Sequence, residues 1–183
     1  SALRPILAGV NPQRPGAWWC HVLCRLGSQK LTSGFAEIAA FMERNPNEVV
    51  TIVVEDYVSR EDIDTSMRDS GLSKFVFVPD EDPDAEWPTL GEMIDENTRL
   101  VIFSEKDKER TAPDYYRQYY EYGMETPFDH KAPTQEQMSC AENRGGNGKQ
   151  LFLMNHWITR ATGSRADAGI VNEKEFLLER ARR

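Results

Sequence analysis

The sequence lacks long hydrophobic runs, internal repeats and any excess of positive charge. A membrane-spanning helix needs about 18 consecutive apolar residues, and no stretch of the chain approaches that length. We therefore expect no spanning segment in these residues. Lys and Arg number 22 against 30 Asp and Glu, which gives a net charge of −8. Because neutralising phosphates requires a basic face, this balance argues against nonspecific nucleic-acid binding and against a polybasic membrane anchor.

The chain is also poor in cysteine and histidine, with three of each, and it has no GxSxG or HExxH motif. Cys20, His21 and Cys24 lie close together in the sequence, but structural zinc takes four ligands, and Cys140 and His130 are remote. A disulfide is the better interpretation in an oxidising compartment, either between Cys20 and Cys24 or from one of them to Cys140.

Two segments imitate ligand-binding loops. Asp80, Asp82 and Asp84 alternate as at the start of a calcium loop, but the sixth position holds Ala and the twelfth holds Gly. The glycine-rich stretch 144–149 contains Arg and Lys, but it precedes a predicted strand, whereas a phosphate loop follows one. We interpret the first segment as a solvated acidic turn and the second as a flexible loop.

The remaining pattern is that of a single α/β domain covering residues 1–183, with a proline-rich, irregular segment at 1–17. Apolar β-branched runs alternate with helical patterns, which favours a mostly parallel sheet. The expected strands lie near 18–22, 49–54, 74–78, 99–103 and 151–155.

Helical signals separate these strands. An apolar stripe at helical spacing predicts a helix that ends at Asn45 and is capped by Thr32 or Ser33; the stripe consists of Phe35, Ile38, Ala39 and Met42. Further helices are expected over 60–70, after the Thr89–Glu92 capping box, over 112–123, and after a cap at Asn172, with 126–149 as loop.

Polar residues gather just beyond the ends of the predicted strands. In folds with parallel strands, ligands bind at the carboxyl ends of the strands. The candidate site residues selected in this way are His21, Glu55, Asp56, Ser104, Lys106, Asn155 and His156. Histidine can donate or accept a proton near neutral pH, so His21 and His156 are the candidates for acid–base work.

Several segments resemble the phosphatidylinositol-specific phospholipase C (PI-PLC) X-domain family, especially its secreted bacterial, fungal and plant members. The most specific match is the run from Asn45 to Ile52 followed by Glu55-Asp56-Tyr57. Supporting matches are Trp19-Cys20-His21, Trp87-Pro88-Thr89-Leu90, Arg99 to Ser104, Glu125 to Phe128, and Leu151 to Trp157. The resemblance begins near Trp18 and covers almost all of the chain.

The resemblance implies a distorted TIM-type barrel and a two-histidine cleavage of a phosphodiester. One histidine deprotonates the inositol 2-hydroxyl, and the other protonates the leaving glycerol oxygen; His21 matches the second, the general acid. The family's first histidine and its RGLxLD-like segment have no match, so we expect a partial domain that is inactive alone. By the same resemblance, Glu55 matches a calcium ligand of calcium-dependent relatives, and Lys106 with Ser104 matches a phosphate contact. The remaining candidates would bind substrate, and no other cofactor is expected.

The resemblance also implies a secreted protein with a phospholipid or other phosphodiester substrate and peripheral membrane contact. Two other functions remain open. One is a noncatalytic X-domain module that binds a lipid headgroup or a protein, which the missing histidine favours for this chain. The other is a metal-dependent enzyme of the glycerophosphodiesterase or sphingomyelinase D type, which would need a denser acidic cluster than Glu55 and Asp56.

Overall fold

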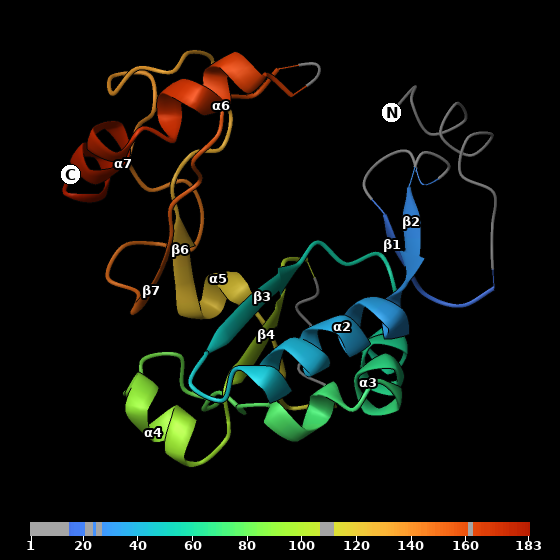
Figure 1. Ribbon diagram of the computed structural model, residues 1–183. Coiled ribbons are helices and arrows are strands. Elements are labelled where there is room, and N and C mark those ends of the chain that lie inside the picture. The colour runs from blue at the N-terminus through green and yellow to red at the C-terminus, as the bar shows by residue number, and fades with distance from the viewer. Residues whose placement is uncertain (1–14, 21–23, 25–26, 107–111, 161–162) are drawn as a thin grey trace. The chain divides into compact units, whose positions relative to one another are not determined.

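A computed structural model describes residues 15–20, 24, 27–106, 112–160 and 163–183. The described chain forms two compact units, one made of segments up to Glu81 together with Glu86–Gln118, and the other of Asp82–Ala85 together with Tyr119–Arg183 (Figure 1). Both units mix helices with short strands, so the α/β class is confirmed. The described strands form three small sheets and no closed barrel.

The first unit is built on a three-stranded parallel sheet, as its unbroken apolar runs predict. Its strands are β3 (Val50–Val54), β4 (Leu100–Ser104) and β5 (Tyr116–Gln118), in the order β3-β4-β5. Residue Val54 pairs in register with Ser104. The two strands therefore end side by side, and whatever follows each of them is brought to one edge of the sheet.

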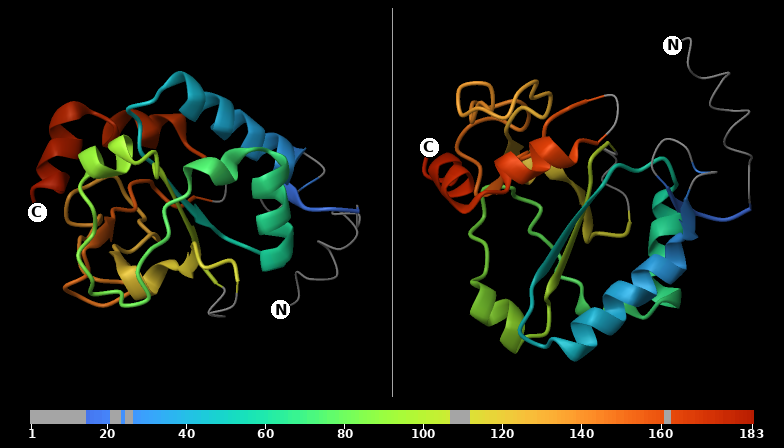
Figure 2. Two further views of the ribbon diagram at one scale, coloured as in Figure 1. Left: turned by 90° about the horizontal axis from the view of Figure 1, so that it is seen from below. Right: turned by 45° about the horizontal axis from the view of Figure 1, so that its top comes forward.

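Two helices lie side by side on one face of β3 and β4 (Figure 2, right). They are α2 (Leu31–Arg44) and α3 (Arg60–Asp69). The predicted apolar stripe of α2 is buried at Phe35 and Met42, which join the core of this unit. The predicted side-chain cap at Thr32 or Ser33 is wrong, because α2 starts two or three residues earlier, with Lys30 at the N-cap position and no capping side chain.

A buried arginine closes the other end of α2. Arg99 is only 3% exposed, and its guanidinium donates to the carbonyl oxygens of Met42, Asn45 and Glu48 at 3.0–3.2 Å. These carbonyls lie at or just beyond the C-terminus of the helix, where backbone acceptors lack partners within the helix and where positive charge is favoured. The side chain that precedes β4 thus fixes the turn that leads into β3.

The predicted strand at 74–78 is wrong. The segment begins as a 3₁₀ helix, η1 (Leu72–Phe75), which follows Gly71 at a φ of 72°. Only Val76 then forms a single parallel bridge, to Leu100. Leu72 and Phe75 are buried in the core. Phe75, which suggested a strand, therefore packs into the core from a 3₁₀ helix instead. The next helix, α4 (Leu90–Asp95), has the predicted capping box between Thr89 and Glu92.

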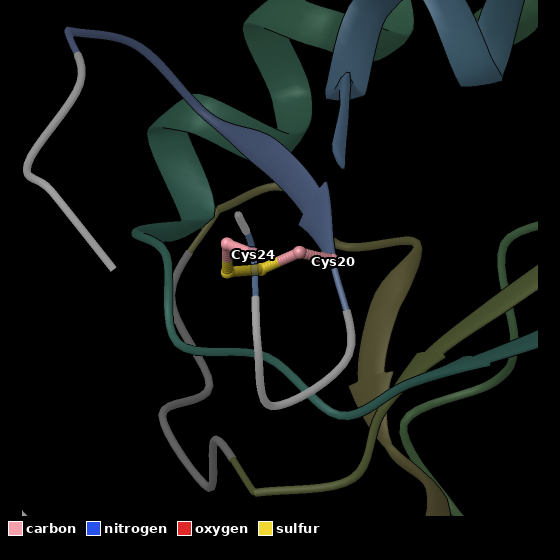
Figure 3. The surroundings of a disulfide bond; sticks show 2 residues. All are labelled: Cys20 and Cys24. Carbon is pink, nitrogen blue, oxygen red and sulfur yellow. A yellow bond between two sulfur atoms is a disulfide. The ribbon is translucent and has the colours of Figure 1, made fainter. Parts of the chain in front are cut away.

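The first described strands form an antiparallel hairpin, not a member of the parallel sheet. Strand β1 (Trp18–Cys20) pairs with β2 (Ser28–Lys30). Cys20 is bonded to Cys24 within this hairpin (Figure 3). This is one of the pairings that the sequence left open, and Cys140 is a free thiol.

The second unit contains a two-stranded parallel sheet of β6 (Gly123–Glu125) and β7 (Leu151–Leu153). Its helices are α5 (Tyr119–Tyr122), α6 (Arg165–Val171) and α7 (Lys174–Ala181). The helix expected over 112–123 is therefore mostly wrong, since this stretch contains β5, only one helical turn and the start of β6. The cap expected at Asn172 is also wrong, because Asn172 ends α6 and Glu173 precedes α7.

Candidate functional site at the ends of β3 and β4

A buried hydrogen-bond network joins the ends of β3 and β4. The Ser104 hydroxyl donates to Oδ1 of Asp56 at 2.8 Å, and Ser104 is completely buried. The backbone N–H of Lys106 lies 3.3 Å from the same Asp56 oxygen and 3.1 Å from the Ser104 hydroxyl. The turn after β4 is therefore tied to the carboxylate that follows β3, and this sets the position of Lys106.

Three side chains form a more exposed layer above this network. The Lys106 ammonium donates to Oε1 of Glu55 at 2.9 Å, and the Tyr57 hydroxyl donates to the same oxygen at 2.9 Å. The ammonium nitrogen also lies 3.4 Å from the centre of the Tyr57 ring. A cation on an aromatic face is attracted by the ring quadrupole, so Lys106 has two attractive partners in this layer.

The surroundings of Lys106 favour its charged form. Burial lowers the pKa of the ammonium, but hydrogen bonding by Tyr57 and Glu55 and the negative charge of Glu55 outweigh that effect and hold the pKa above its ordinary value. Lys106 is therefore a fixed positive charge at neutral pH. Lys106 and Glu55 thus form an ion pair at the edge of the sheet, next to the Asp56 carboxylate.

Beneath the network lies a buried aromatic residue from the third strand. Tyr116 is fully buried, and burial, followed by the nearby charge of Asp56, raises the pKa of its hydroxyl. The guanidinium of Arg60, at the start of α3, lies 5.2 Å from the centre of the same ring and donates to the Tyr116 carbonyl oxygen. These contacts connect all three strands to α3 below Asp56.

Asn155 lies in the second unit, where it connects the ends of β6 and β7. Its side-chain amide donates to Oε2 of Glu125 at 3.1 Å and to the Thr126 carbonyl oxygen at 2.6 Å. Glu125, which is 2% exposed, also accepts hydrogen bonds from Arg144 and Asn143. Burial raises the pKa of Glu125, but these hydrogen bonds and the charge of Arg144 hold it below its ordinary value.

His156 has both ring nitrogens within hydrogen-bond distance of protein groups. Nε2 lies 2.8 Å from the Val171 carbonyl oxygen, and Nδ1 lies 2.8 Å from Nη1 of Arg180. The same guanidinium reaches Nε2 of His130 at 3.2 Å. His156 also borders a hollow of about 550 Å³ that is lined in part by Trp157.

The structure therefore brings four of the predicted site residues together in the first unit: Glu55, Asp56, Ser104 and Lys106. Asn155 and His156 belong to the second unit, and His21 lies outside the described residues. Sequence reasoning missed Tyr57 and Glu125 as site residues, although both stand inside segments that resemble the X-domain family. It also missed Arg180, for which the sequence carries no local signal.

The described residues do not fit the calcium ligand set suggested for Glu55. Its Oε1 already accepts from the Lys106 ammonium and the Tyr57 hydroxyl, and a positive charge at that distance repels a cation. Within the ranges that the structure describes, no group of three or more acidic, histidine or cysteine side chains is placed to hold a metal ion.

Comparison with known proteins decides the family. The family model for PI-PLC X matches residues 10–165. The chain belongs to the PI-PLC X domain family. This confirms the resemblance seen in the sequence, and the X-domain match includes β3, β4 and the residues that follow them.

Three curated relatives support this assignment. A PI-PLC X domain-containing protein of Arabidopsis thaliana is 30% identical over 159 residues, covering 78% of this chain and 36% of the relative. PI-PLC X domain-containing protein 1 of Arthroderma benhamiae is 28% identical over 148 residues, covering 76% of this chain and 48% of the relative. An uncharacterized secreted protein of the same fungus is 28% identical over 145 residues, covering 75% and 33%.

The chain thus spans between a third and a half of the length of these relatives. No solved structure matches it. Among the helices that the structure describes, none is both long enough and apolar enough to cross a bilayer.

Proposed function

We propose that this X domain belongs to a phosphoric diester hydrolase or lyase of the phosphatidylinositol phospholipase C type, and that its full fold is a distorted TIM-type barrel. The observation that carries the proposal is the fixed cation at the ends of β3 and β4. Lys106 is held there by Glu55 and Tyr57 above a buried Asp56–Ser104 pair. A phosphodiester carries one negative charge, and such a site can bind it at a strand end.

The proposed reaction divides the work between an anion site and a proton donor. A base, the family's first histidine, takes the proton of the inositol 2-hydroxyl, and the oxygen attacks phosphorus. The bond from phosphorus to the glycerol oxygen breaks, and a cyclic phosphate forms. His21 gives its proton to the departing glycerol oxygen. Lys106 would offset the negative charge on the phosphoryl oxygens while this happens, and Asp56 and Ser104 would keep the Lys106 backbone in place.

The remaining parts of the proposal follow from the family and from one relative. Asn155 and His156 keep their proposed role as substrate contacts. A secreted location is proposed because one relative is called a secreted protein and because a disulfide is present. We also propose that the protein contacts a lipid surface peripherally, so that a lipid substrate can reach the site.

A noncatalytic binding module is the second candidate, and one observation favours it for residues 1–183 alone. The reaction needs a base as well as an acid. The two described histidines, His130 and His156, both contact Arg180 through a ring nitrogen, and neither stands where the family places its first histidine. An X domain with His21 and Lys106 but without a base would bind a phosphodiester headgroup and not cleave it.

Turnover and binding separate these two candidates. Cleavage of phosphatidylinositol would be measured for residues 1–183 and for any longer natural form of the protein, with His21→Ala, Lys106→Ala and a Phe41→Leu control on the surface of α2. If a form is active, His21→Ala should lower turnover by about 10²–10⁴-fold, and Phe41→Leu should leave it unchanged. An active form that keeps full turnover after His21→Ala would refute His21 as the acid.

A further inference from the structure

Tyr57 is both highly exposed and fixed in place. Its residue surface is 81% exposed, yet its hydroxyl is hydrogen-bonded to Glu55 at 2.9 Å and its ring lies under the Lys106 ammonium at 3.4 Å. Core packing therefore does not account for an aromatic residue at this position. Within the described residues, its hydrogen bond is with Glu55 and its ring contact is with Lys106.

The ammonium of Lys106 has donor capacity beyond these contacts. A lysine side chain carries three N–H donors. Glu55 and Tyr57 are its two side-chain hydrogen-bond partners, which leaves one donor for a ligand. The face of the Tyr57 ring also attracts the positive charge of the ammonium. The Lys106 side chain remains 38% exposed, so an anion in solution can reach it.

Both ends of Lys106 are anchored. Its backbone N–H contacts Asp56 and Ser104, as described above, and its ammonium contacts Glu55 and Tyr57. A flexible lysine loses considerable rotamer entropy when it binds a ligand. An ammonium that is held in place before the ligand arrives loses less, and so it binds an anion more tightly.

We propose that Tyr57 is a positioning residue that holds the Lys106 ammonium ready for the phosphate group of a ligand. Tyr57 supplies the aromatic face under the charge, and its hydroxyl orients Glu55, which takes one of the ammonium hydrogens. The inference rests on the proposed function for the location of the ligand, but it concerns binding and can be tested without turnover.

Two variants of Tyr57 divide its contribution into parts, and two further variants serve as a control and as removal of the charge. Tyr57→Phe keeps the ring and removes the hydroxyl, whereas Tyr57→Leu removes both. Phe41→Leu is the matched control, because Phe41 is also an exposed aromatic residue of the first unit, at 41% exposure, and it lies on α2. Lys106→Ala removes the charge itself.

The geometry would be tested first by NMR. An ammonium above an aromatic ring places the neighbouring ε-methylene protons in the ring-current field of Tyr57. These protons should be shifted upfield in the natural protein, in Tyr57→Phe and in Phe41→Leu, and they should move to ordinary lysine positions in Tyr57→Leu. An unshifted ε-methylene in the natural protein would overturn the proposal.

Binding would then be measured by titration with diethyl phosphate and with inorganic phosphate, followed on the backbone amides of residues 104–106. Tyr57→Leu should weaken binding about two- to fivefold, the range expected for an exposed cation–π contact. Tyr57→Phe should stay within about twofold, Phe41→Leu should match the natural protein, and Lys106→Ala should abolish the response. Preference for diethyl phosphate would assign a diester ligand, and equal binding would assign the phosphate group generally.

Equal affinity of Tyr57→Leu and the natural protein, or no response to either anion, would overturn the positioning role. Failure of the proposed function has a different signature. In that case both anions bind with the expected variant pattern, and no form of the protein cleaves phosphatidylinositol.

Discussion

Nη1 of Arg180 lies 2.8 Å from Nδ1 of His156, a residue 24 positions earlier in the chain. A guanidinium can only donate hydrogen bonds, so this nitrogen of His156 is the acceptor and the hydrogen sits on Nε2, facing the Val171 carbonyl oxygen. Nε2 of His130 lies 3.2 Å from the same guanidinium and 3.3 Å from the Asn155 carbonyl oxygen. Arg180 thus ties α7 to the segments that contain both histidines.

Replacing Arg180 should strongly destabilise the second unit. Arg180 is 1% exposed and also donates to the carbonyl oxygens of Asn155 and Met138. Arg180→Met would leave several buried acceptors without donors, and we expect a loss of about 3–5 kcal/mol in the free energy of unfolding. Urea denaturation followed by tryptophan fluorescence measures this.

The matched control is Arg183→Ala, because Arg183 is exposed and makes one hydrogen bond to a carbonyl oxygen, that of Gln135. Its loss should cost about 0.5 kcal/mol or less. Similar costs for the Arg180 and Arg183 variants would contradict the central role of Arg180.

Two neighbouring glycines should respond very differently to alanine. Both have positive φ, 98° at Gly145 and 82° at Gly146. A Cβ at Gly145 would lie 2.0 Å from the Gly123 carbonyl oxygen, whereas one at Gly146 would meet nothing within 4 Å. Gly146→Ala should cost about 1 kcal/mol from backbone strain alone.

Gly145→Ala should cost clearly more, about 3 kcal/mol or above, because the loop must move away from β6. Thermal unfolding of both variants under the same conditions gives the comparison. An equal shift in Tm would show that the loop does not pack against Gly123 in solution.

Protonation of Glu125 should lower the free energy of unfolding in acid. Its pKa in the folded protein is held below the ordinary value of glutamate, so its stabilising effect is complete above about pH 4.5 and is lost as the pH falls through the folded pKa. The free energy of unfolding should therefore decline in this range. Glu125→Gln should flatten that part of the profile, because the group no longer titrates, and it should lower stability at pH 7.

Denaturation at pH 3–7 of both forms measures the effect, with Glu142→Gln as an exposed control. A Glu125→Gln profile parallel to that of the natural protein would mean that other carboxylates account for the acid sensitivity.

The disulfide should make a modest contribution to stability. Cys20 and Cys24 are four residues apart in sequence, and closing so short a loop restricts the unfolded chain little, which corresponds to about 2 kcal/mol. Mass spectrometry under nonreducing conditions should find one free thiol, at Cys140, and Cys20→Ser with Cys24→Ser should lower the free energy of unfolding by about that amount. Three free thiols in secreted material would contradict the pairing.

Local patterns in the sequence determined the α/β class, the core strands β3 and β4, the buried stripe of α2 and the capping box of α4. They also placed Glu55, Asp56, Ser104 and Lys106 together, because parallel neighbours end at the same edge of a sheet. Hydrophobic periodicity and capping are properties of a few adjacent residues, so they can be recognised without the rest of the chain. Substrate binding by these residues remains a prediction.

Only the tertiary structure decided the other features. The apolar run at 74–78 is helical at its start because Leu72 and Phe75 pack into the core beside α3, and β1 joins a hairpin closed by a disulfide. Tyr57 under Lys106 and Arg180 between two histidines join positions 24–50 residues apart. Which side chains become partners depends on how the backbone folds. Local spacing in the sequence does not contain that information.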